Sequence, residues 1–379
     1  MMRYVMKIGI AAFFLNRTHS GGKEQVFFNL LRGFQALGKS RNIHIFAYEY
    51  SAGVIQSSIP DATFTFIPYK DIWGKKTLSD CVCNTFRLSR LLKEQHIGVL
   101  FFPHYNTGLK QFKIPTVVLP HDIQNIINAD QSSLRERIIY GLQYYFDFKL
   151  RSKIIAISDY DRREIEYYYP QHKSKLTRIY NPIDTDFIPS TRKYHRKRPY
   201  ICAINIAYVH KNTITLIKAF EKIMGLIEHN LLLVGRLNRD TEFLRNYVEK
   251  NHLGERVEFT GFLEDQELHR LLCQASLFVN PSLFEGFGMP AIEAAIRCIP
   301  VISSITGASP EVTRNLLNYY EPADDADRLA EKILEVLHTE PSPAKLEAIK
   351  CEYLANYAYT KISADYYEFL GELMNEDRG

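Results

Sequence analysis

The sequence predicts an α/β protein of two domains, each built on a parallel β-sheet covered by helices. Short apolar runs alternate with longer amphipathic stretches along the chain, which is the pattern of strands joined by helical crossovers. Its 379 residues are enough for two ordinary domains. Residues 183–199 are proline-rich and basic and have no periodicity, so they are predicted to be a linker between domains 1–182 and 200–360.

Each half carries its own series of predicted strands. Helical patterns fill most of the gaps, for example at residues 23–37 and 213–227. The first half contains the runs KIGIAAFFL, NIHIFAYEY, ATFTFIPY, IGVLFFP, IPTVVLP and SKIIAIS, and the second half contains YICAIN, NLLLVG, VEFTG, LFVNPS and IPVISS. Ligands of such sheets bind beyond the carboxyl ends of the strands, so a cleft between the two domains is the expected site.

Composition indicates a globular protein of the cytoplasm. The chain is 46 % hydrophobic and 24 % charged, and its six cysteines lack the spacing of a zinc site, so we expect reduced thiols. The apolar run Ile8–Leu15 resembles a short signal peptide, but a first buried strand explains it better because the run is brief. No stretch approaches the roughly 18–20 apolar residues of a membrane span.

The charge is distributed unevenly. Residues 1–190 carry a net charge of +9 and residues 200–379 carry −10. A basic first domain could contact an anionic membrane peripherally, at its inner face, or a phosphorylated acceptor, although a chance distribution is an equal alternative. The amphipathic stretch Leu134–Lys153 could lie on such a membrane, with an ordinary packing helix as the favoured alternative. The basic cluster Arg192–Arg198 could bind phosphate or be a solvated loop.

The segment PSLFEGFGMPAIEAAIRCIPVI, Pro281–Ile302, carries the strongest signal for a ligand site. Gly286 and Gly288 form a flexible turn, after which the pattern is helical. The free N–H groups at such a helix start attract a phosphate or a polar sugar. Glu285 precedes this helix and Glu293 lies about one turn inside it, so both can face one ligand. A helix cap at Glu285 with a solvated Glu293 is the alternative.

The order of motifs in the second half resembles retaining glycosyltransferase family 4, also called glycosyltransferase group 1. Pro281–Ile302 resembles the E-x7-E signature of that family. VHKNTITLIKAF (Val209–Phe220), LLLVG, VEFTGFL and ASPEV (Ala308–Val312) resemble its other motifs. The match is strong over about residues 200–325 and weak in the first half. It implies a GT-B fold: two Rossmann-like domains with parallel sheets facing a central cleft, and a C-terminal helix, here within 361–379, that crosses back to the first domain.

This resemblance also implies an activity. The family transfers a hexose-type sugar, with retention of configuration and without a metal, from a nucleotide sugar to a saccharide or lipid-linked acceptor. A UDP- or GDP-sugar donor would bind to residues 200–360, and the acceptor to residues 1–182. Cell-surface polysaccharide or glycoconjugate synthesis is the expected context. We expect no cofactor besides the donor substrate, and no nucleic-acid partner.

The resemblance assigns a role to each matching residue of the second half. Glu285 would accept hydrogen bonds from hydroxyls of the donor sugar, with the backbone N–H groups of Phe287 and Gly288 nearby. Glu293 would bind the ribose hydroxyls, since a carboxylate suits a diol. Lys211 would contact the diphosphate and stabilise the charge that develops as it leaves.

One family residue is missing from the second half. Many members carry an arginine just after the first strand, where this chain has Asn205 and Ile206. Arg236, after LLLVG, is the candidate replacement, and an ordinary surface arginine is the alternative.

Two segments of the first half resemble family loops. HSGGKEQVFFNLL places Gly21 and Gly22 in a turn that opens a helix, where backbone N–H groups could approach the donor phosphates. A plain tight turn is equally compatible with two glycines. VVLPHDI places His121 just past a strand end, close to the transferred sugar in the family. A structural histidine is the alternative.

The aspartates Asp325 and Asp327 have the D-x-D spacing of metal-dependent glycosyltransferases of another fold. They start an acidic helix, so a helix cap is the better interpretation, and we expect no catalytic metal. Three other functions compete. These are a GT-B sugar-nucleotide epimerase or phosphorylase, a dinucleotide oxidoreductase, which would need a G-x-G-x-x-G motif that the chain lacks, and a sugar-nucleotide-binding protein without transfer activity.

Overall fold

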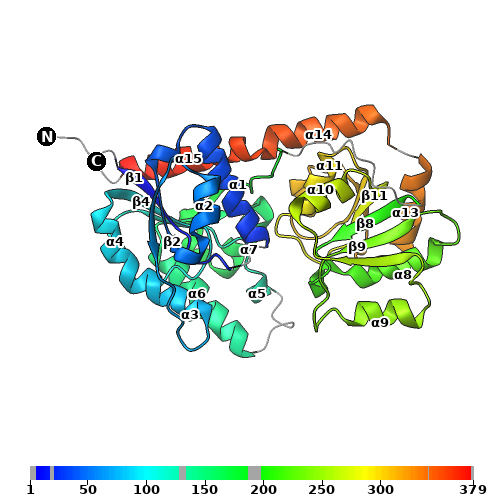
Figure 1. The fold of residues 1–379 in the computed structure, drawn as a ribbon, viewed down its shortest axis with the longest axis horizontal. Coiled ribbons are helices and arrows are strands. Elements are labelled where there is room, and N and C mark those ends of the chain that lie inside the picture. The colour runs from blue at the N-terminus through cyan, green and yellow to red at the C-terminus, as the bar shows by residue number, and fades with distance from the viewer. Residues whose placement is uncertain (1–5, 18–20, 128–133, 187–197, 340, 377–379) are drawn as a thin grey trace. The chain divides into compact units, whose positions relative to one another are not determined.

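The chain forms two compact units (Figure 1). One unit comprises Met1–Pro182 together with Tyr357–Gly379, and the other comprises Ile183–Asn356. The basic cluster at 192–197 and most of the predicted linker lie outside the described residues. The computed structural model describes residues 6–17, 21–127, 134–186, 198–339 and 341–376.

The first unit contains a seven-stranded parallel sheet with the strand order β3-β2-β1-β4-β5-β6-β7. The strands β2 and β4 are mostly apolar and buried along their whole length, because helices cover both sides of the sheet (Figure 1). The strands are β1 (Lys7–Ala11), β2 (Ile43–Tyr48), β3 (Thr63–Ile67), β4 (Ile97–Phe102), β5 (Thr116–Val118), β6 (Lys153–Ala156) and β7 (Leu176–Arg178). The described helices of this unit are α1 (Gly22–Ala36), α2 (Ala52–Ser58), α3 (Lys76–Val82), α4 (Leu88–Glu94), α5 (Gln124–Ile127), α6 (Leu134–Leu150), α7 (Asp159–Tyr168) and α15 (Tyr359–Glu376).

The second unit contains a six-stranded parallel sheet with the order β10-β9-β8-β11-β12-β13. Its core packs leucine, isoleucine and valine from the strands against helices α8 and α13. The strands are β8 (Tyr200–Ile204), β9 (Asn230–Val234), β10 (Val257–Gly261), β11 (Leu277–Asn280), β12 (Val301–Ser304) and β13 (Asn318–Tyr320). The described helices are α8 (Thr213–Ile223), α9 (Phe243–Lys250), α10 (Asp265–Leu272), α11 (Met289–Ala295), α12 (Ser309–Val312), α13 (Ala326–Thr339) and α14 (Pro343–Tyr357).

The two sheets share one topology, which confirms the predicted α/β fold class. In each sheet the strand order reverses once, between β1 and β4 in the first and between β8 and β11 in the second. At such a reversal, the connections leave toward opposite faces, and the strand ends open a crevice at the carboxyl edge. The topology therefore marks one expected ligand position in each unit. All the predicted strand runs contain a strand, and β7 and β13 are short strands that the sequence analysis did not predict.

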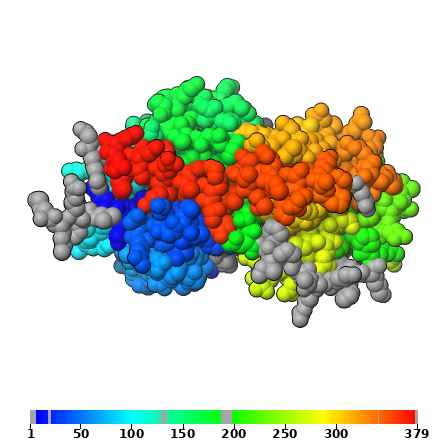
Figure 2. All heavy atoms as spheres, turned by 90° about the horizontal axis from the view of Figure 1, so that it is seen from above, coloured from blue at the N-terminus to red at the C-terminus, as the bar shows by residue number. Residues whose placement is uncertain are grey.

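The C-terminal helix α15 returns to the first unit, as the resemblance implies, and packs along α1. Figure 2 shows the two helices side by side, α15 in red and α1 in blue. Gly33 of α1 allows the close approach, since a Cβ added there would lie 2.0 Å from Oγ of Ser363. Tyr367 also accepts a 2.7 Å hydrogen bond from the side chain of Asn42. Within the described ranges, no helix is both long and apolar enough to cross a membrane.

Candidate active site

A buried carboxylate and an ammonium meet at the strand-order reversal of the second sheet. Lys211 ends the short 3-10 turn Val209–Lys211 that follows β8, and Glu285 lies in the loop that follows β11. Because β8 and β11 are neighbours, both loops leave the same edge of the sheet. Nζ of Lys211 donates to Oε1 of Glu285 over 2.7 Å, and the Glu285 residue is 5 % exposed. Tertiary structure thus joins residues 74 positions apart.

The loop that carries Glu285 is held on one side by the segment after β8. The backbone N–H of Leu283 donates to the carbonyl of His210 over 2.8 Å. The side-chain amide of Asn212 donates to the carbonyl of Pro281 over 3.0 Å. Asn212 adopts a left-handed conformation with φ of 53°, which asparagine tolerates better than most residues. This turn places Lys211 beside the loop.

The segment after β12 holds the same loop from the other side. Oγ of Ser304 and Oγ1 of Thr306 donate to the carbonyl of Ser282 over 2.6 and 2.9 Å. The backbone N–H of Ala308 donates to the carbonyl of Glu285 over 2.8 Å. The ASPEV motif therefore belongs to the site, because it fixes the main chain of the glutamate.

The Glu285 carboxylate is stabilised in its charged form. Burial alone would raise its pKa. The Lys211 ammonium opposes this through its charge and its hydrogen bond, and Oγ of Ser282 donates a further hydrogen bond over 2.7 Å. Together these contacts outweigh burial, so the pKa of Glu285 is lowered. Burial, together with the positive charge of Lys211, lowers the pKa of His210 to about 4, although the Glu285 carboxylate acts in the opposite direction. The Glu285 carboxylate is therefore ionised at neutral pH, and the imidazole of His210 is neutral.

The remaining residues of the signature surround the start of α11. Gly288 precedes the helix with φ of 86°, a conformation that favours glycine. Phe287 is buried, and Glu293 is 8 % exposed, one turn inside the helix. Glu293 is therefore buried, and the alternative of a solvated glutamate at this position does not hold.

Arg236 lies apart from the Lys211–Glu285 pair. It follows β9 and is exposed, and its guanidinium lies 5.1 Å from the ring centroid of Phe262. In the parts of the chain that the structure describes, no hydrogen bond or ion pair joins Arg236 to this pair.

In the first unit, the glycine turn and His121 both lie at the carboxyl edge of the sheet. Gly21 caps α1 with φ of 136°, and Gly22 is the first helical residue and exposed. This turn needs glycine because residues with a side chain rarely adopt that φ, and a Cβ at Gly21 would also lie 2.7 Å from the Glu24 carboxylate. His121 follows β5 with φ of 70°, and its Nε2 lies 2.9 Å from the carbonyl of Pro103. A carbonyl only accepts, so Nε2 carries the proton and Nδ1 is an acceptor.

Sequence reasoning missed several polar residues at these two edges. Ser282 and His210 contact Glu285 or its loop, but single polar residues in loops give no sequence signal. In the first unit, it missed the lysines Lys23 and Lys76 and the imidazole of His104, which meet only after folding. The adjacency of β1 and β4 could have suggested the contact, because His104 closely follows β4 and Lys23 lies in the first turn of the helix after β1.

The first aspartate of the D-x-D spacing, Asp325, caps a helix. Oδ1 of Asp325 accepts hydrogen bonds from the backbone N–H groups of Asp327 and Arg328 over 2.8 and 3.0 Å. This geometry confirms the predicted cap at the start of α13. Among the residues described, no three histidine, cysteine or acidic side chains gather in a way that could hold a metal ion.

Comparison with known proteins places the chain in a family. The family model described as Glycosyltransferase Family 4 matches residues 20–187, and the model described as Glycosyl transferases group 1 matches residues 185–359. The O-antigen chain mannosyltransferase B of Escherichia coli is 26 % identical over 57 % of this chain. That match spans 60 % of the length of the relative.

Solved structures share the fold over almost the whole chain. The sucrose-phosphate synthase of Thermosynechococcus elongatus superposes with a TM-score of 0.79 at 17 % identity, covering 98 % of this chain and 100 % of that one. HepE of Anabaena, solved in complex with UDP-glucose, superposes with a TM-score of 0.73 at 15 % identity, covering 97 % and 100 %. These structures have the GT-B architecture of two parallel-sheet units. The two family models together span residues 20–359, and the chain belongs to the group 1 glycosyltransferases, glycosyltransferase family 4.

Proposed function

We propose that the protein is a retaining, metal-independent hexosyltransferase that uses a nucleotide-sugar donor. The observation that carries this proposal is the buried Lys211–Glu285 pair at the strand-order reversal of the second sheet. The family gives the reaction class. The mannosyltransferase relative supports a hexose and a role in cell-surface polysaccharide synthesis, and the HepE complex supports a UDP-sugar, with a GDP-sugar as the other candidate.

In this proposal, Lys211 assists departure of the nucleoside diphosphate. An ammonium has three donors, so Lys211 can keep its bond to Glu285 and still donate to a phosphate oxygen. Its positive charge then stabilises the negative charge that grows on the leaving group. This role requires no metal ion.

In this proposal, the two carboxylates hold the two sugars of the donor. Oε1 of Glu285 already accepts two hydrogen bonds, and its other oxygen has capacity for a hydroxyl of the transferred hexose. Glu293 receives the ribose hydroxyls. The backbone N–H groups of Phe287 and Gly288 lie in the same loop as Glu285 and complete this part of the donor site.

The first domain supplies the acceptor side of the reaction in this proposal. Nδ1 of His121 accepts a hydroxyl hydrogen of the transferred sugar or of the saccharide or lipid-linked acceptor. The backbone at Gly21 and Gly22 contacts the donor phosphates, and Arg236 remains the candidate for a second diphosphate cation. Residues 1–182 form the acceptor domain, 200–360 the donor domain, and 361–379 the returning segment.

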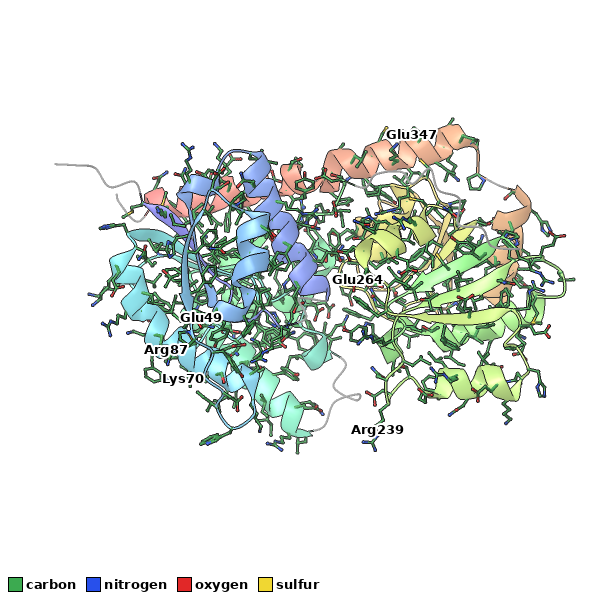
Figure 3. The ribbon with its side chains drawn as sticks, viewed as in Figure 1. Glu49, Lys70, Arg87, Arg239, Glu264 and Glu347 are labelled. Carbon is green, nitrogen blue, oxygen red and sulfur yellow. The ribbon has the colours of Figure 1, made fainter. Side chains whose placement is uncertain are left out.

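Sugar transfer and donor hydrolysis test this function. Purified protein is incubated with UDP-glucose and with GDP-mannose, and release of UDP or GDP is measured with and without candidate glycan acceptors. We expect slow hydrolysis of one donor, and loss of at least 100-fold in Glu285→Gln. The matched control is Glu264→Gln, an exposed glutamate of the same unit (Figure 3). Donor binding without any turnover would instead support a sugar-nucleotide-binding protein.

We further propose that the first domain contacts an anionic membrane through α6. Four apolar side chains of this helix recur on one face and stay exposed: Leu134 at 72 %, Ile138 at 55 %, Leu142 at 53 % and Tyr145 at 40 %. A neighbouring face of the helix packs into the core through Tyr144 and Phe148. The helix is therefore apolar on two faces, and only one of them is covered within the described residues.

Charge next to this exposed face favours an anionic surface. Arg135 and Arg137 are exposed in the first turn of α6 and outnumber Glu136 there, and Lys149 is exposed in its last turn. Co-sedimentation with phosphatidylglycerol vesicles tests the contact, with phosphatidylcholine vesicles for comparison. We expect binding only to the anionic vesicles and its loss in Ile138→Glu, while Leu226→Glu, a change at an exposed leucine of the other unit, leaves it intact.

A further inference from the structure

A polar cavity lies at the strand-order reversal of the first sheet. It has a volume of about 130 Å³, several times what one water needs, and is bordered by Ala11 at the end of β1 and Phe102 at the end of β4. This is the position in the first unit that corresponds to Lys211 and Glu285 in the second. None of the roles proposed above uses this cavity.

The ammonium of Lys23 in the cavity wall has no anionic partner. It projects from the first turn of α1 and lies 3.2 Å from Nε2 of His104 and 5.9 Å from the ring centroid of Phe14. No carboxylate lies within ion-pair distance of it in the described part of the chain. Burial lowers the pKa of Lys23, and Lys76 lowers it further against the opposing effect of Glu24. An anion in the cavity would therefore stabilise this charge.

The imidazole of His104 presents an unused donor. The Lys23 ammonium only donates, so Nε2 of His104 must be the acceptor and Nδ1 must carry the proton. Nδ1 is buried and has no hydrogen-bond partner among the described residues. A buried donor without a partner costs free energy, which a bound ligand can recover.

The side chain of Asn84 presents an unused acceptor in the same wall. It is 6 % exposed and lies in the π-helical turn Cys83–Arg87 between α3 and α4, a kind of turn that is frequent at functional sites. Its Nδ2 donates to the carbonyl of Asn106 over 2.9 Å, which identifies Oδ1 as the free end. Oδ1 is buried and has no partner within the described residues. One hydroxyl group, which both donates and accepts, can satisfy His104 and Asn84 together.

The other lining groups make the cavity positive and partly apolar. Nζ of Lys76 donates to Oδ2 of Asp80 and to the carbonyl of Phe13, both over 2.6 Å, so that lysine and that aspartate neutralise each other. Among the described residues, the positive charge of Lys23 has no ion-pair partner in the cavity wall. The rings of Phe14, Phe102 and Tyr105 line the remaining wall, as is usual in ligand sites where a few polar groups fix the orientation.

We propose that this cavity binds the acceptor of the transfer reaction through an anionic group, a phosphate or a carboxylate, and a neighbouring hydroxyl. Lys23 pairs with the anion, and the hydroxyl accepts from Nδ1 of His104 and donates to Oδ1 of Asn84. The aromatic rings pack against the apolar edge of the sugar. The inference that the bound saccharide is the acceptor rests on the proposed transferase function, whereas the binding site itself does not.

Binding of simple anionic sugars tests the site directly. Mannose 6-phosphate, glucuronate and neutral mannose are titrated against the full chain by calorimetry. We expect one anionic sugar to bind at least tenfold more tightly than mannose, and the better of the two distinguishes phosphate from carboxylate. Lys23→Gln should weaken that binding at least tenfold, because one charge-assisted hydrogen bond is lost. Lys23→Arg should restore most of it, and Lys70→Gln, at an exposed lysine of the same unit (Figure 3), should not change it.

Two further measurements separate this proposal from the transferase proposal. Lys211→Gln should weaken UDP or GDP binding and leave anionic-sugar binding unchanged. The ring signals of His104 should shift in NMR spectra of the unchanged protein when the anionic sugar is added, which tests the site even if the Lys23 variants do not fold. Equal binding of mannose and both anionic sugars, or unshifted His104 signals, overturns the cavity proposal while the donor assays stand. Binding of an anionic sugar without turnover of a nucleotide sugar would support the proposed cavity site and contradict the proposed transferase function.

Discussion

Gly307 lies so close to the main chain of Glu285 that no larger residue fits. A Cβ added to Gly307 would lie 2.3 Å from the Glu285 carbonyl oxygen, and its φ of 55° already favours glycine. The glycine lets the segment after β12 hold the loop after β11. The position of the carboxylate thus depends on a residue that has no side chain.

Gly307→Ala should displace the Glu285 loop. We expect a loss of about 1–3 kcal/mol in the free energy of unfolding, because the main chain must shift, and a fall in transferase activity. Urea unfolding and the donor assay measure both. The control is Gly254→Ala, since a Cβ at exposed Gly254 meets nothing within 4 Å. Equal effects of the two substitutions would contradict the close packing.

Removing one member of the Lys211–Glu285 pair should destabilise the protein more than removing both. Glu285→Ala leaves a largely buried ammonium without its partner, at a cost of about 3 kcal/mol. The double change Glu285→Leu with Lys211→Met removes both charges, so we expect part of that stability to return. Urea unfolding at pH 7 compares the variants. A double variant less stable than Glu285→Ala would show that the pair matters through packing alone.

The lowered pKa of Glu285 predicts a pH dependence of the same pair. Its ionised form is favoured in the folded state, so its contribution to stability is present above the unfolded pKa of about 4.3 and is lost as the pH falls through the lower folded value. The difference in unfolding free energy between the wild type and Glu285→Gln should therefore shrink in acid. A constant difference from pH 7 to pH 3 would contradict the lowered pKa.

Buried histidines should stay neutral in mildly acidic solution. The pKa is lowered to about 4, chiefly by burial, in His44, His121 and His210. Their ring signals in NMR spectra should not titrate between pH 7 and 5, whereas unperturbed histidines titrate near 6.5. Unfolded histidines take up protons in that window, so each of the three lowers stability as the pH falls from about 6.5 to 4. Asp80, whose pKa burial raises to about 6, acts in the opposite direction.

The contact of α15 with α1 should respond to Gly33. Gly33→Ala places a Cβ 2.8 Å from the carbonyl of Tyr359 as well as against Ser363, so we expect a loss of several kcal/mol. Thermal unfolding measures it. Gly371→Ala is the control within α15, where a Cβ meets nothing within 4 Å and alanine is the better helix former. Stabilisation by both substitutions would show that α15 can move away at no cost.

The sequence predicted the strand series and the order of the motifs well, because buried parallel strands are continuous apolar runs. It missed β7 and β13, which have only three residues each and carry no such run. It identified Glu285 and Lys211 through motif resemblance. It did not identify Ser282, because a single serine in a loop gives no sequence signal. It did not identify the Lys23–His104 contact, because residues 81 positions apart meet only after the strands have taken their order in the sheet.

The amino-acid sequence by itself determined the fold class and the family, since hydrophobic periodicity and motif order are properties of the chain. Only the tertiary structure decided which charges are paired. Sheet topology brings Lys211 to Glu285 and leaves Lys23 beside a neutral imidazole, although both are lysines that follow a strand. The physical reason is that burial and distance set the energy of a charge, and neither is defined before the strands take their order in the sheet.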